Sequence, residues 1–350
     1  MREIVIQSAA PYSVRIGEGL LEKAGALSAS LIQGRKAMIA AGEQVFSLYG
    51  AALRSSLEAA GFAVFDCVYP SGEEEKTPET LMAIIESLAR AGFCRADAVF
   101  ALGGGVTGDM AGLAAALYQR GLACILLPTT LLAAADASVG GKTAVNLSSG
   151  KNQMGVFSQP RLVLCDTGCF QSLPPEHWKN GWAEIIKTSF LREGKLQDLL
   201  ADDEPEAYLE EIIALALQTK GSFAAEDERD CGRRRLLNFG HTVGHAIEHA
   251  SAYCWSHGAA VAAGMAIITR AAYAKGLCGI DCVHTLEALL SRFALPARCD
   301  LEKNALLAAM RSDKKRQDEH VSIVVPRAYG RCEVLVLPLG ELGDWLDLGL

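Results

Sequence analysis

The sequence predicts an α/β fold for the first part of the chain and a mainly helical fold for the rest. Over roughly the first 165 residues, short β-rich runs alternate with longer alanine- and leucine-rich stretches at helical spacing. One run, 98–102, is apolar at every position, as expected of a strand buried on both faces. We therefore expect a doubly wound, mostly parallel sheet in residues 1–172. From about Leu173 the pattern becomes helical, so a second, mainly α-helical domain is expected in residues 173–350.

The expected elements follow from the hydrophobic pattern in chain order. Strands are expected at 3–6, 36–41, 63–68, 98–102, 124–128 and 162–165. Helices in the second half are expected at 182–191, 208–223, 242–252, 258–275, 283–293 and 304–310. A late strand is expected at 321–325, and the glycine-rich segment 128–152 is interpreted as a long loop.

The composition is that of a globular protein. The chain has 350 residues, of which 50% are hydrophobic and 21% are charged. Its 33 Lys and Arg residues against 41 Asp and Glu residues give a net charge of -8. This balance argues against a protein that binds nucleic acid or an anionic membrane surface. Any anionic ligand would need a local basic pocket.

Because of three absences, we expect the protein to be cytoplasmic. No apolar run reaches the ~20 residues of a membrane-spanning helix, since the longest, near 258–268, is interrupted by glycines. The N-terminal residues show no secretory signal. The eleven cysteines include no Cys-x-x-Cys pair, which disfavours both a disulfide framework and a thiolate zinc site.

The strand at 98–102 runs directly into a glycine-rich turn. Glycines 103, 105 and 108 have the G-x-G-x-x-G spacing at a strand-to-helix junction, where a dinucleotide pyrophosphate binds the free N–H groups at the helix start. A tight turn without a ligand is the alternative. The acidic residue expected ~20 positions downstream for the ribose hydroxyls is missing, so this is not a standard Rossmann fingerprint.

A second glycine-rich segment, 128–143, ends like a phosphate-binding P-loop. A Walker A loop needs glycine six positions before the lysine, and Asp136 occupies that position, which disfavours a nucleoside triphosphatase. Lys142, Lys151, Asn146 and Asn152 remain, and together they suit an anionic, hydroxyl-rich ligand.

Four of the seven histidines lie between His241 and His257. His241, His245 and Glu248 have the i, i+4, i+7 spacing of one helix face, and imidazoles with a carboxylate are ligands that suit Zn²⁺. Spacing alone nominates His241 with His245 as the ligand pair. The absence of H-E-x-x-H makes a metalloprotease a poor fit, and ordinary packed histidines are the alternative.

Eleven segments form an ordered signature: Ser71-Gly-Glu-Glu-Glu-Lys76, Gly103-Gly-Gly-Val-Thr-Gly-Asp109, Tyr118-Gln-Arg-Gly121, Pro128-Thr-Thr-Leu-Leu132, Asp136-Ala-Ser-Val-Gly-Gly-Lys-Thr143, Gly150-Lys-Asn152, Gly181-Trp-Ala-Glu-Ile-Ile-Lys187, Asp227-Glu-Arg-Asp-Cys-Gly232, Leu237-Asn-Phe-Gly-His-Thr-Val-Gly-His-Ala-Ile-Glu248, His257-Gly258 and Asp313-Lys-Lys315. Together they resemble the family of 3-dehydroquinate synthases over most of the chain. The resemblance implies an NAD-dependent dinucleotide domain, a helical domain that binds Zn²⁺ or Co²⁺, and a homodimer. The implied reaction converts 3-deoxy-D-arabino-heptulosonate 7-phosphate to 3-dehydroquinate and phosphate by transient oxidation, β-elimination, reduction, ring opening and aldol closure.

The same resemblance implies roles for individual residues. The metal ligands would be Glu184, His241 and His257, in place of the His241 and His245 pair. The NAD contacts would be Ser71, Gly72, Glu73, Lys76, Gly104, Gly105, Val106, Asp109, Thr129, Thr130, Lys142 and Lys151. The catalytic and anion-binding residues would be Lys142, Asn152, Lys187, Lys220, Arg234, Asn238, His245, Lys314 and Asp136, with Arg120 reaching in from the second subunit.

Other functions on the same fold are the alternatives. Sister sugar-phosphate cyclases would make a different carbocycle, and a metal-dependent polyol dehydrogenase would release NADH. Lys220 and Arg234 favour a substrate with a carboxylate, because a neutral substrate would leave a desolvated guanidinium without a partner. A non-catalytic binding module would lack so complete a set of charged and metal-binding residues.

Overall fold

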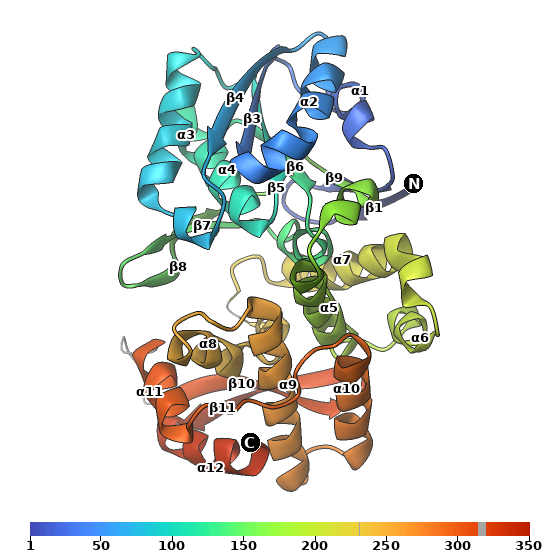
Figure 1. The fold of residues 1–350 in the computed structure, drawn as a ribbon, viewed down its shortest axis with the longest axis vertical. Helices are drawn as coiled ribbons and strands as arrows, with labels where there is room; N and C mark the ends of the chain where they lie inside the picture. Colours follow the sequence, from blue (N-terminus) through green and yellow to red (C-terminus); the bar gives the residue numbers. More distant parts are fainter. Residues whose placement is uncertain (231, 314–319) are drawn as a thin grey trace. The chain divides into compact units, whose positions relative to one another are not determined.

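A seven-stranded sheet forms the centre of the N-terminal half in this computed structural model (Figure 1). Its strands are β1 (Arg2–Ile6), β2 (Tyr12–Gly17), β3 (Lys36–Gly42), β4 (Ala63–Tyr69), β5 (Ala98–Gly103), β6 (Ala123–Pro128) and β9 (Leu162–Asp166). They lie in the order β1-β2-β9-β6-β5-β3-β4, and every neighbouring pair is parallel except β1 with β2. The structure describes residues 1–230, 232–313 and 320–350, which divide into two units, Met1–Leu173 and Pro174–Leu350.

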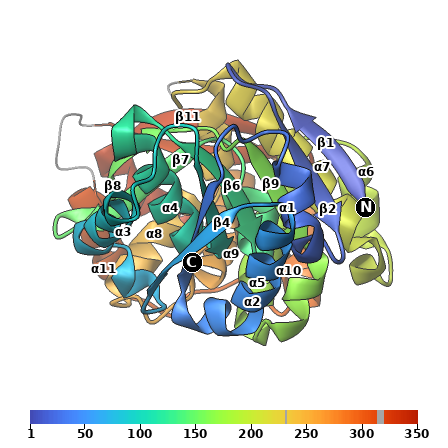
Figure 2. The same cartoon turned by 90° about the horizontal axis from the view of Figure 1, so that it is seen from above.

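Helices cover both faces of this sheet. They are α1 (Ala24–Ser28), α2 (Glu43–Ala59), α3 (Pro78–Arg90) and α4 (Gly105–Leu117). Val99 and Ala101 of β5 join a buried cluster with α3 and α4, whereas Phe100 points the other way and meets Phe62, which follows α2. Figures 1 and 2 show α3 and α4 on one side of the sheet and α1 and α2 on the other. The expected doubly wound, mostly parallel α/β fold is therefore confirmed.

The segment 128–152 is not the long loop that the sequence pattern favoured. It contains a π-helical turn, Ala133–Ala137, and then enters an antiparallel hairpin of β7 (Lys142–Leu147) and β8 (Gly150–Phe157). Thr143 and Val145 of β7 are buried, and Gly112 on α4 leaves room for Thr143, since a Cβ there would lie 2.8 Å from Thr143 Cγ2. The hairpin thus gains its buried face from α4, a contact that the local sequence does not reveal.

Strand β2 was also missed, although its signal is local. Tyr12, Val14 and Ile16 are buried and alternate with more exposed neighbours, which is the period-2 pattern of a strand. This strand continues the parallel sheet beside β9 and carries β1 as an antiparallel edge.

The second unit is mainly helical, as expected. Its helices are α5 (Pro175–Ser189), α6 (Lys195–Ala201), α7 (Leu209–Glu226), α8 (His241–Ala250), α9 (His257–Ala274), α10 (Ile280–Arg292), α11 (Lys303–Asp313) and α12 (Leu342–Gly349). A two-stranded hairpin, β10 (His320–Ala328) with β11 (Arg331–Pro338), packs beside them. Of these elements, α6, α12 and β11 were not expected from the sequence.

Helix α9 is the core helix of this unit. It contacts α5, α8, α10 and α12, and thirteen of its residues are buried, so it is apolar on nearly all sides. This explains the apolar run at 258–268 as the centre of a helical core. Among the described residues, no helix is both long and apolar enough to cross a membrane.

Glycines allow α9 to approach its neighbours closely. A Cβ on Gly264 would lie 2.2 Å from the carbonyl oxygen of Gly240, and a Cβ on Gly244 would lie 3.0 Å from Cα of Val261. At the start of α9, a Cβ on Gly258 would lie 2.4 Å from Cα of Asn180 on α5. These close contacts fix the first turns of α8 and α9 against each other and against α5.

We expect Gly264→Ala to lower the free energy of unfolding by about 1 to 3 kcal/mol, because the added methyl group overlaps backbone that cannot move aside. Urea unfolding followed by circular dichroism measures this. Gly340→Ala is the matched control, because nothing lies within 4 Å of a Cβ built there. Equal stability of the two variants would contradict the close-packing argument.

Candidate metal centre and dinucleotide turn

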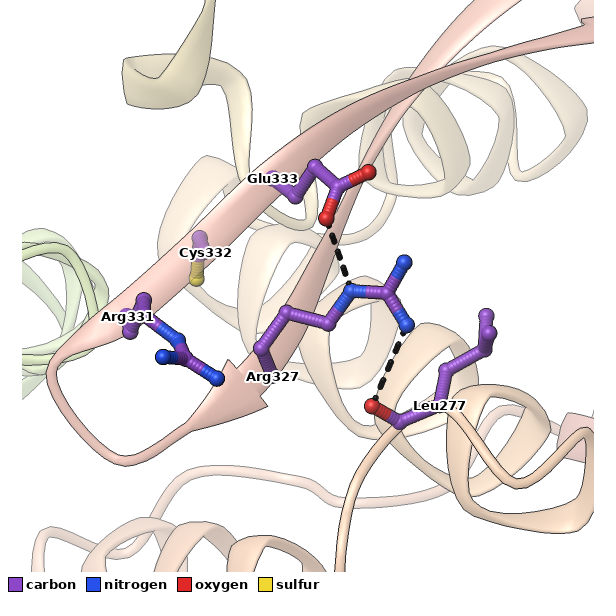
Figure 3. Close-up of a pocket in the computed structure, with 5 residues that line it drawn as sticks. All are labelled: Leu277, Arg327, Arg331, Cys332 and Glu333. Carbon is purple, nitrogen blue, oxygen red and sulfur yellow. Dashed lines mark hydrogen bonds and ion pairs between the residues drawn. The ribbon is translucent and has the colours of Figure 1, made fainter.

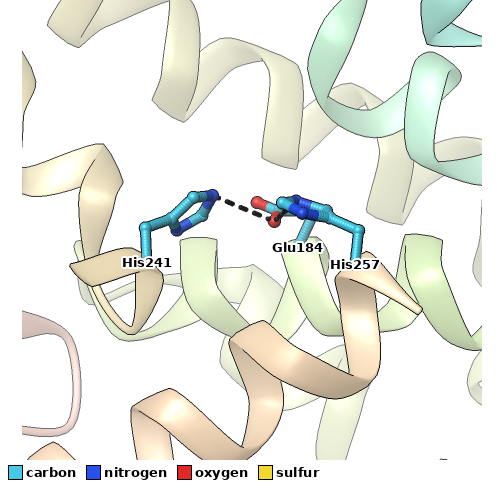
Figure 4. Close-up of side chains that lie close together, drawn as sticks. All are labelled: Glu184, His241 and His257. Carbon is cyan, nitrogen blue, oxygen red and sulfur yellow. Dashed lines mark hydrogen bonds and ion pairs between the residues drawn. The ribbon is translucent and has the colours of Figure 1, made fainter. Parts of the chain in front are cut away.

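Three side chains with metal-binding atoms converge from three helices (Figure 4). Glu184 lies within α5, while His241 and His257 are the first residues of α8 and α9. Glu184 Oε1 is 3.3 Å from His257 Nε2 and 3.5 Å from His241 Nε2. One donor atom from each of the three residues lies within 4.8 Å of the others.

The spacing of these donors fits a divalent cation. Ligands bound tetrahedrally at 2.0–2.1 Å from Zn²⁺ lie about 3.3 to 3.4 Å from one another. The two measured separations, 3.3 and 3.5 Å, match that value closely. Two imidazoles and one carboxylate also leave a coordination position open, as in catalytic rather than structural zinc sites.

His241 presents a lone pair to the centre of the group. Burial lowers the pKa of His241 to about 3, so its imidazole is neutral. Its Nδ1 lies 3.2 Å from the carbonyl oxygen of Phe239 and donates to it, which leaves Nε2 without a proton. The lone pair of Nε2 therefore faces an oxygen of Glu184, an arrangement that a cation between the two atoms would stabilise.

His257 lies between two carboxylates. Burial disfavours its charged form, but hydrogen bonds with Glu184 and Glu248 outweigh this and raise the pKa of His257 to about 10. Its Nε2 faces Glu184, and its Nδ1 lies 3.3 Å from Glu248 Oε2. The two carboxylates thus favour positive charge at this position.

Glu184 is ionised although its side chain is only 2% exposed. Burial alone would raise its pKa, but the Lys187 ammonium, His241 and His257 hold the pKa well below its usual range. Lys187 forms an ion pair with Glu184 Oε2 one turn along α5. Lys187, expected among the anion-binding residues, thus contacts the carboxylate of a candidate metal ligand in this structure.

The other catalytic and anion-binding residues expected in this unit differ in burial and in their contacts. Arg234 is 1% exposed, and its Nη1 donates to the carbonyl oxygen of Glu228 at 2.9 Å. The ring of His245 lies 5.4 Å from that of His241, and the donor group that contains His241 does not include His245. Lys220 lies on α7 and is partly buried, whereas Asn238 is exposed. Lys314 lies outside the described residues.

In the first unit, helix α4 begins at Gly105, directly after β5, as the glycine pattern predicts. The backbone N–H of Thr129 donates to the carbonyl oxygen of Gly103 at 3.0 Å. A Cβ on Gly104 would lie 3.2 Å from Thr130 Cγ2, so the β6 end lies beside the turn. The small pocket there is lined by Ala101, Gly103, Gly104, Gly105, Gly108, Leu126, Leu127, Pro128, Ala133, Ala137 and Ser138.

Lys76 connects several of the expected cofactor-binding residues. Its buried ammonium lies 2.6 Å from Asp109 Oδ2 on α4 and 2.6 Å from Asn152 Oδ1 on β8. Beside it, Asn146 Nδ2 donates to Glu73 Oε1 at 2.9 Å. The segment that holds Glu73 and Lys76 is thereby fixed to the glycine-turn helix and to the hairpin.

The remaining expected residues of this unit occupy surface or turn positions. Lys142 and Lys151 are exposed on the hairpin, and Asp136 lies in the π-helical turn. Ser71 and Gly72 are exposed ahead of Glu73, and Val106 is partly buried in the first turn of α4. Arg120 is exposed after α4, with φ of 70°, a left-handed conformation that is uncommon for a residue with a side chain.

Two groups at the candidate metal centre make contacts that the sequence did not predict. The carbonyl of Phe239 accepts from His241, and Glu248 accepts from His257. The i+7 spacing of Glu248 from His241 placed it on the right helix face, but spacing could not show which ring it would contact. No sequence signal could have indicated a backbone carbonyl as a partner.

A hollow of about 420 Å³ lies elsewhere in the second unit, on the β10–β11 hairpin (Figure 3). It is lined by Leu277, Arg327, Arg331, Cys332 and Glu333. Arg327 Nε donates to Glu333 at 2.8 Å, and its Nη1 donates to the carbonyl oxygen of Leu277. Neither Glu184 nor His241 nor His257 lines this hollow, and we assign it no function.

Comparison with known proteins agrees with this arrangement. Residues 66–180 match the family model for the N-terminal part of 3-dehydroquinate synthase, and residues 181–316 match the model for its C-terminal part. The 3-dehydroquinate synthase of Xanthomonas axonopodis pv. citri is 41% identical over 350 residues, which covers 95% of this chain and 94% of that protein.

Two solved structures have the same fold along their whole length. A 2-deoxy-scyllo-inosose synthase complexed with carbaglucose-6-phosphate, NAD⁺ and Co²⁺ is 27% identical, with a TM-score of 0.88 and full coverage of both chains. The 2-epi-5-epi-valiolone synthase of Streptomyces hygroscopicus subsp. jinggangensis, with NAD⁺ and Zn²⁺ bound, is also 27% identical, with a TM-score of 0.86 and coverage of 99% and 98%. With both family models matched in order, the chain belongs to the 3-dehydroquinate synthase family.

Proposed function

We propose that this chain converts 3-deoxy-D-arabino-heptulosonate 7-phosphate to 3-dehydroquinate and phosphate, with NAD and Zn²⁺ or Co²⁺ as its cofactors. The observation that carries the proposal is the convergence of Glu184, His241 and His257 in a chain of this family. The two related structures, which contain NAD⁺ with Co²⁺ or Zn²⁺, support the cofactor assignment.

The metal would be held by Glu184, His241 and His257. When bound, the metal supplies a Lewis acid for the substrate hydroxyls and NAD supplies a reversible hydride acceptor. The Nδ1–H group of His241 donates a hydrogen bond to the carbonyl oxygen of Phe239, which leaves Nε2 available as a ligand. Lys187 balances the charge of Glu184 and holds its carboxylate in place on α5.

The dinucleotide would bind at the glycine turn of the first unit. The helix start at Gly105 offers unpaired N–H groups and the positive end of a helix dipole to the pyrophosphate. Lys76 orients Asp109 and holds its carboxylate close to the turn. Ser71, Gly72, Glu73, Thr129, Thr130, Lys142 and Lys151 complete the proposed contacts.

The substrate carries a carboxylate and a phosphate, so its binding requires fixed cations in a chain whose net charge is -8. We assign Arg234 and Lys220 to the carboxylate. Lys142, Asn152, Asn238 and His245 are assigned to the phosphate and its surroundings, with Lys187, Lys314, Asp136 and Arg120 as further catalytic residues. The nearly complete burial of Arg234 supports this assignment, because its charge attracts an anion more strongly where little water screens it.

The alternatives are not favoured. A 3-dehydroquinate synthase is 41% identical to this chain, whereas the inosose and valiolone synthases are 27% identical. A homodimer in the cytoplasm completes the proposal. The ten cysteines in the described part of the chain are free thiols, as expected in a reducing compartment.

Replacing a metal ligand should weaken metal binding and reduce turnover together. We expect His241→Ala to weaken Zn²⁺ or Co²⁺ binding at least about 100-fold, because loss of a ligand exceeds the effect of losing a ligand's hydrogen-bond partner. Metal analysis of the dialysed proteins measures this, with about one ion per chain expected in the unsubstituted protein. His249→Ala on the same helix is the control, since His249 is exposed and is not one of the three proposed metal ligands. Full activity of metal-free protein would refute the metal assignment.

Replacing the buried arginine should affect substrate binding and leave cofactor binding intact. We expect Arg234→Ala to weaken binding of the heptulosonate phosphate by about 2 to 4 kcal/mol, since a charge-assisted bidentate contact is lost. Calorimetry with substrate and with NAD⁺ measures both affinities. Arg233→Ala is the control, because the neighbouring guanidinium is exposed and pairs with Glu226. Equal losses for both ligands would indicate damage to the fold instead.

The proposed conversion is redox-neutral overall, so NADH should not accumulate. Bound NAD⁺ at a concentration far below that of substrate should support many turnovers, with one phosphate released per substrate consumed. Absorbance at 340 nm and a phosphate assay, recorded together, measure the two quantities. NADH formation in step with substrate consumption, without phosphate release, would instead identify a polyol dehydrogenase.

A further inference from the structure

One buried carboxylate beside the metal centre has no role in the proposed function. Glu248 lies on α8, one turn beyond His245, and is only 5% exposed. Its Oε2 lies 3.3 Å from Nδ1 of His257. Burying a carboxylate is unfavourable unless it is paired, so its contact with His257 helps to stabilise it. The question is what this contact does for His257.

Glu248 contacts the nitrogen of His257 that faces away from the other donors. Nε2 of the same ring lies 3.3 Å from Glu184 Oε1, so the two ring nitrogens have different carboxylate partners. An ionised carboxylate can only accept, so Nδ1 donates to Glu248. The contact therefore fixes the orientation of the ring and leaves Nε2 as the nitrogen that can bind a metal ion in place of a proton.

His257 needs such an anchor more than His241 does. Its side chain is 32% exposed, compared with 15% for His241, so surrounding side chains restrain it less. His241 is oriented by the carbonyl of Phe239, two residues before it in the chain. The anchor of His257 is instead a charged side chain from a neighbouring helix.

The backbone at the end of α8 holds Glu248 in position. Tyr253 N donates to the carbonyl oxygen of Glu248 at 2.7 Å, and Ala252 N donates to that of His249 at 3.1 Å, as in a Schellman motif. Ala252 and Tyr253 both have left-handed backbone angles, with φ of 50° and 61°. This turn ends the helix and leads the chain back towards His257, which explains how residues nine apart come into contact.

We propose that Glu248 is a positioning residue of the metal centre, which acts through the Nδ1 proton of His257 to direct Nε2 towards the metal. This inference rests on the proposed metal site formed by Glu184, His241 and His257. Carboxylate partners of metal-binding histidines fix the ring and increase the basicity of the ligating nitrogen, and their loss reduces metal affinity by about 10- to 100-fold.

A second metal ion is the alternative arrangement. His245, Glu248 and His257 also place one donor atom each within 4.8 Å of one another. If metal ions occupied both positions, His257 would have to bind one ion through each of its ring nitrogens. The direct contact of Glu248 with Nδ1 favours a hydrogen bond, and the number of bound ions decides between the two arrangements.

The test measures Co²⁺ affinity by competition with a chromophoric chelator, and it records the visible absorption of the bound Co²⁺. We expect Glu248→Gln to bind Co²⁺ 10- to 100-fold more weakly than the unsubstituted protein. We also expect its Co²⁺ spectrum to change, because the ligand field of His257 changes. Glu287→Gln is the control, since Glu287 pairs with Arg270 and belongs to neither donor group. Circular dichroism of the metal-free proteins checks that each variant is folded.

Two further variants separate positioning from a general effect of charge. Glu248→Asp keeps the charge but draws the carboxylate back by one methylene group, so we expect Co²⁺ binding weaker than in the unsubstituted protein. In a His257→Ala background, Glu248→Gln should have no further effect on Co²⁺ affinity, because the residue through which Glu248 acts is gone. A full additional loss in that background would overturn the inference, and so would unchanged affinity in both Glu248→Gln and Glu248→Asp.

The same titrations distinguish failure of this inference from failure of the proposed function. Two Co²⁺ ions in the unsubstituted protein and one in Glu248→Gln would make Glu248 a ligand and overturn its positioning role, while the first metal site would stand. Absence of Co²⁺ and Zn²⁺ binding to the unsubstituted protein would overturn the metal part of the proposed function, and this inference with it.

Discussion

The candidate metal centre of the second unit exists only because three helices approach one another closely. Glu184, His241 and His257 belong to α5, α8 and α9, and their donor atoms meet only because the helix backbones come unusually near to one another. Glycine at positions 258 and 264 permits this, since a Cβ at either would overlap backbone of a neighbouring helix. Two of the three donors are also first residues of their helices, so small changes in helix packing would move them directly.

The electrostatics of the centre follow from that packing. Burial removes water from a carboxylate and two imidazoles, so each must be stabilised by its neighbours. Lys187 and the histidines keep Glu184 ionised, the Phe239 carbonyl orients a neutral His241, and two carboxylates surround His257. The resulting set presents one carboxylate and two imidazoles to a cation.

In the first unit, contacts between distant segments hold several loop residues beside the glycine turn. Lys76 does this with a single buried ammonium, which contacts Asp109 on a helix and Asn152 on a hairpin. The glycine turn itself is built locally by β5 and α4, and the end of β6 closes it on one side. A locally encoded turn thus acquires its polar surroundings from segments that are distant in the chain.

The sequence by itself determined the α/β sheet, the helical second half, the glycine turn and the concentration of histidines, because hydrophobic period and residue spacing are local properties. Spacing also placed Glu248 on the same helix face as His241. Only the tertiary structure decided that Glu184 meets His257, 73 residues away, and that Lys76 meets Asn152, 76 residues away. It also formed the β7–β8 hairpin against α4, where local pattern favoured a loop. These contacts depend on which helix faces come together, and that is fixed by packing of the whole unit and not by any local run of residues.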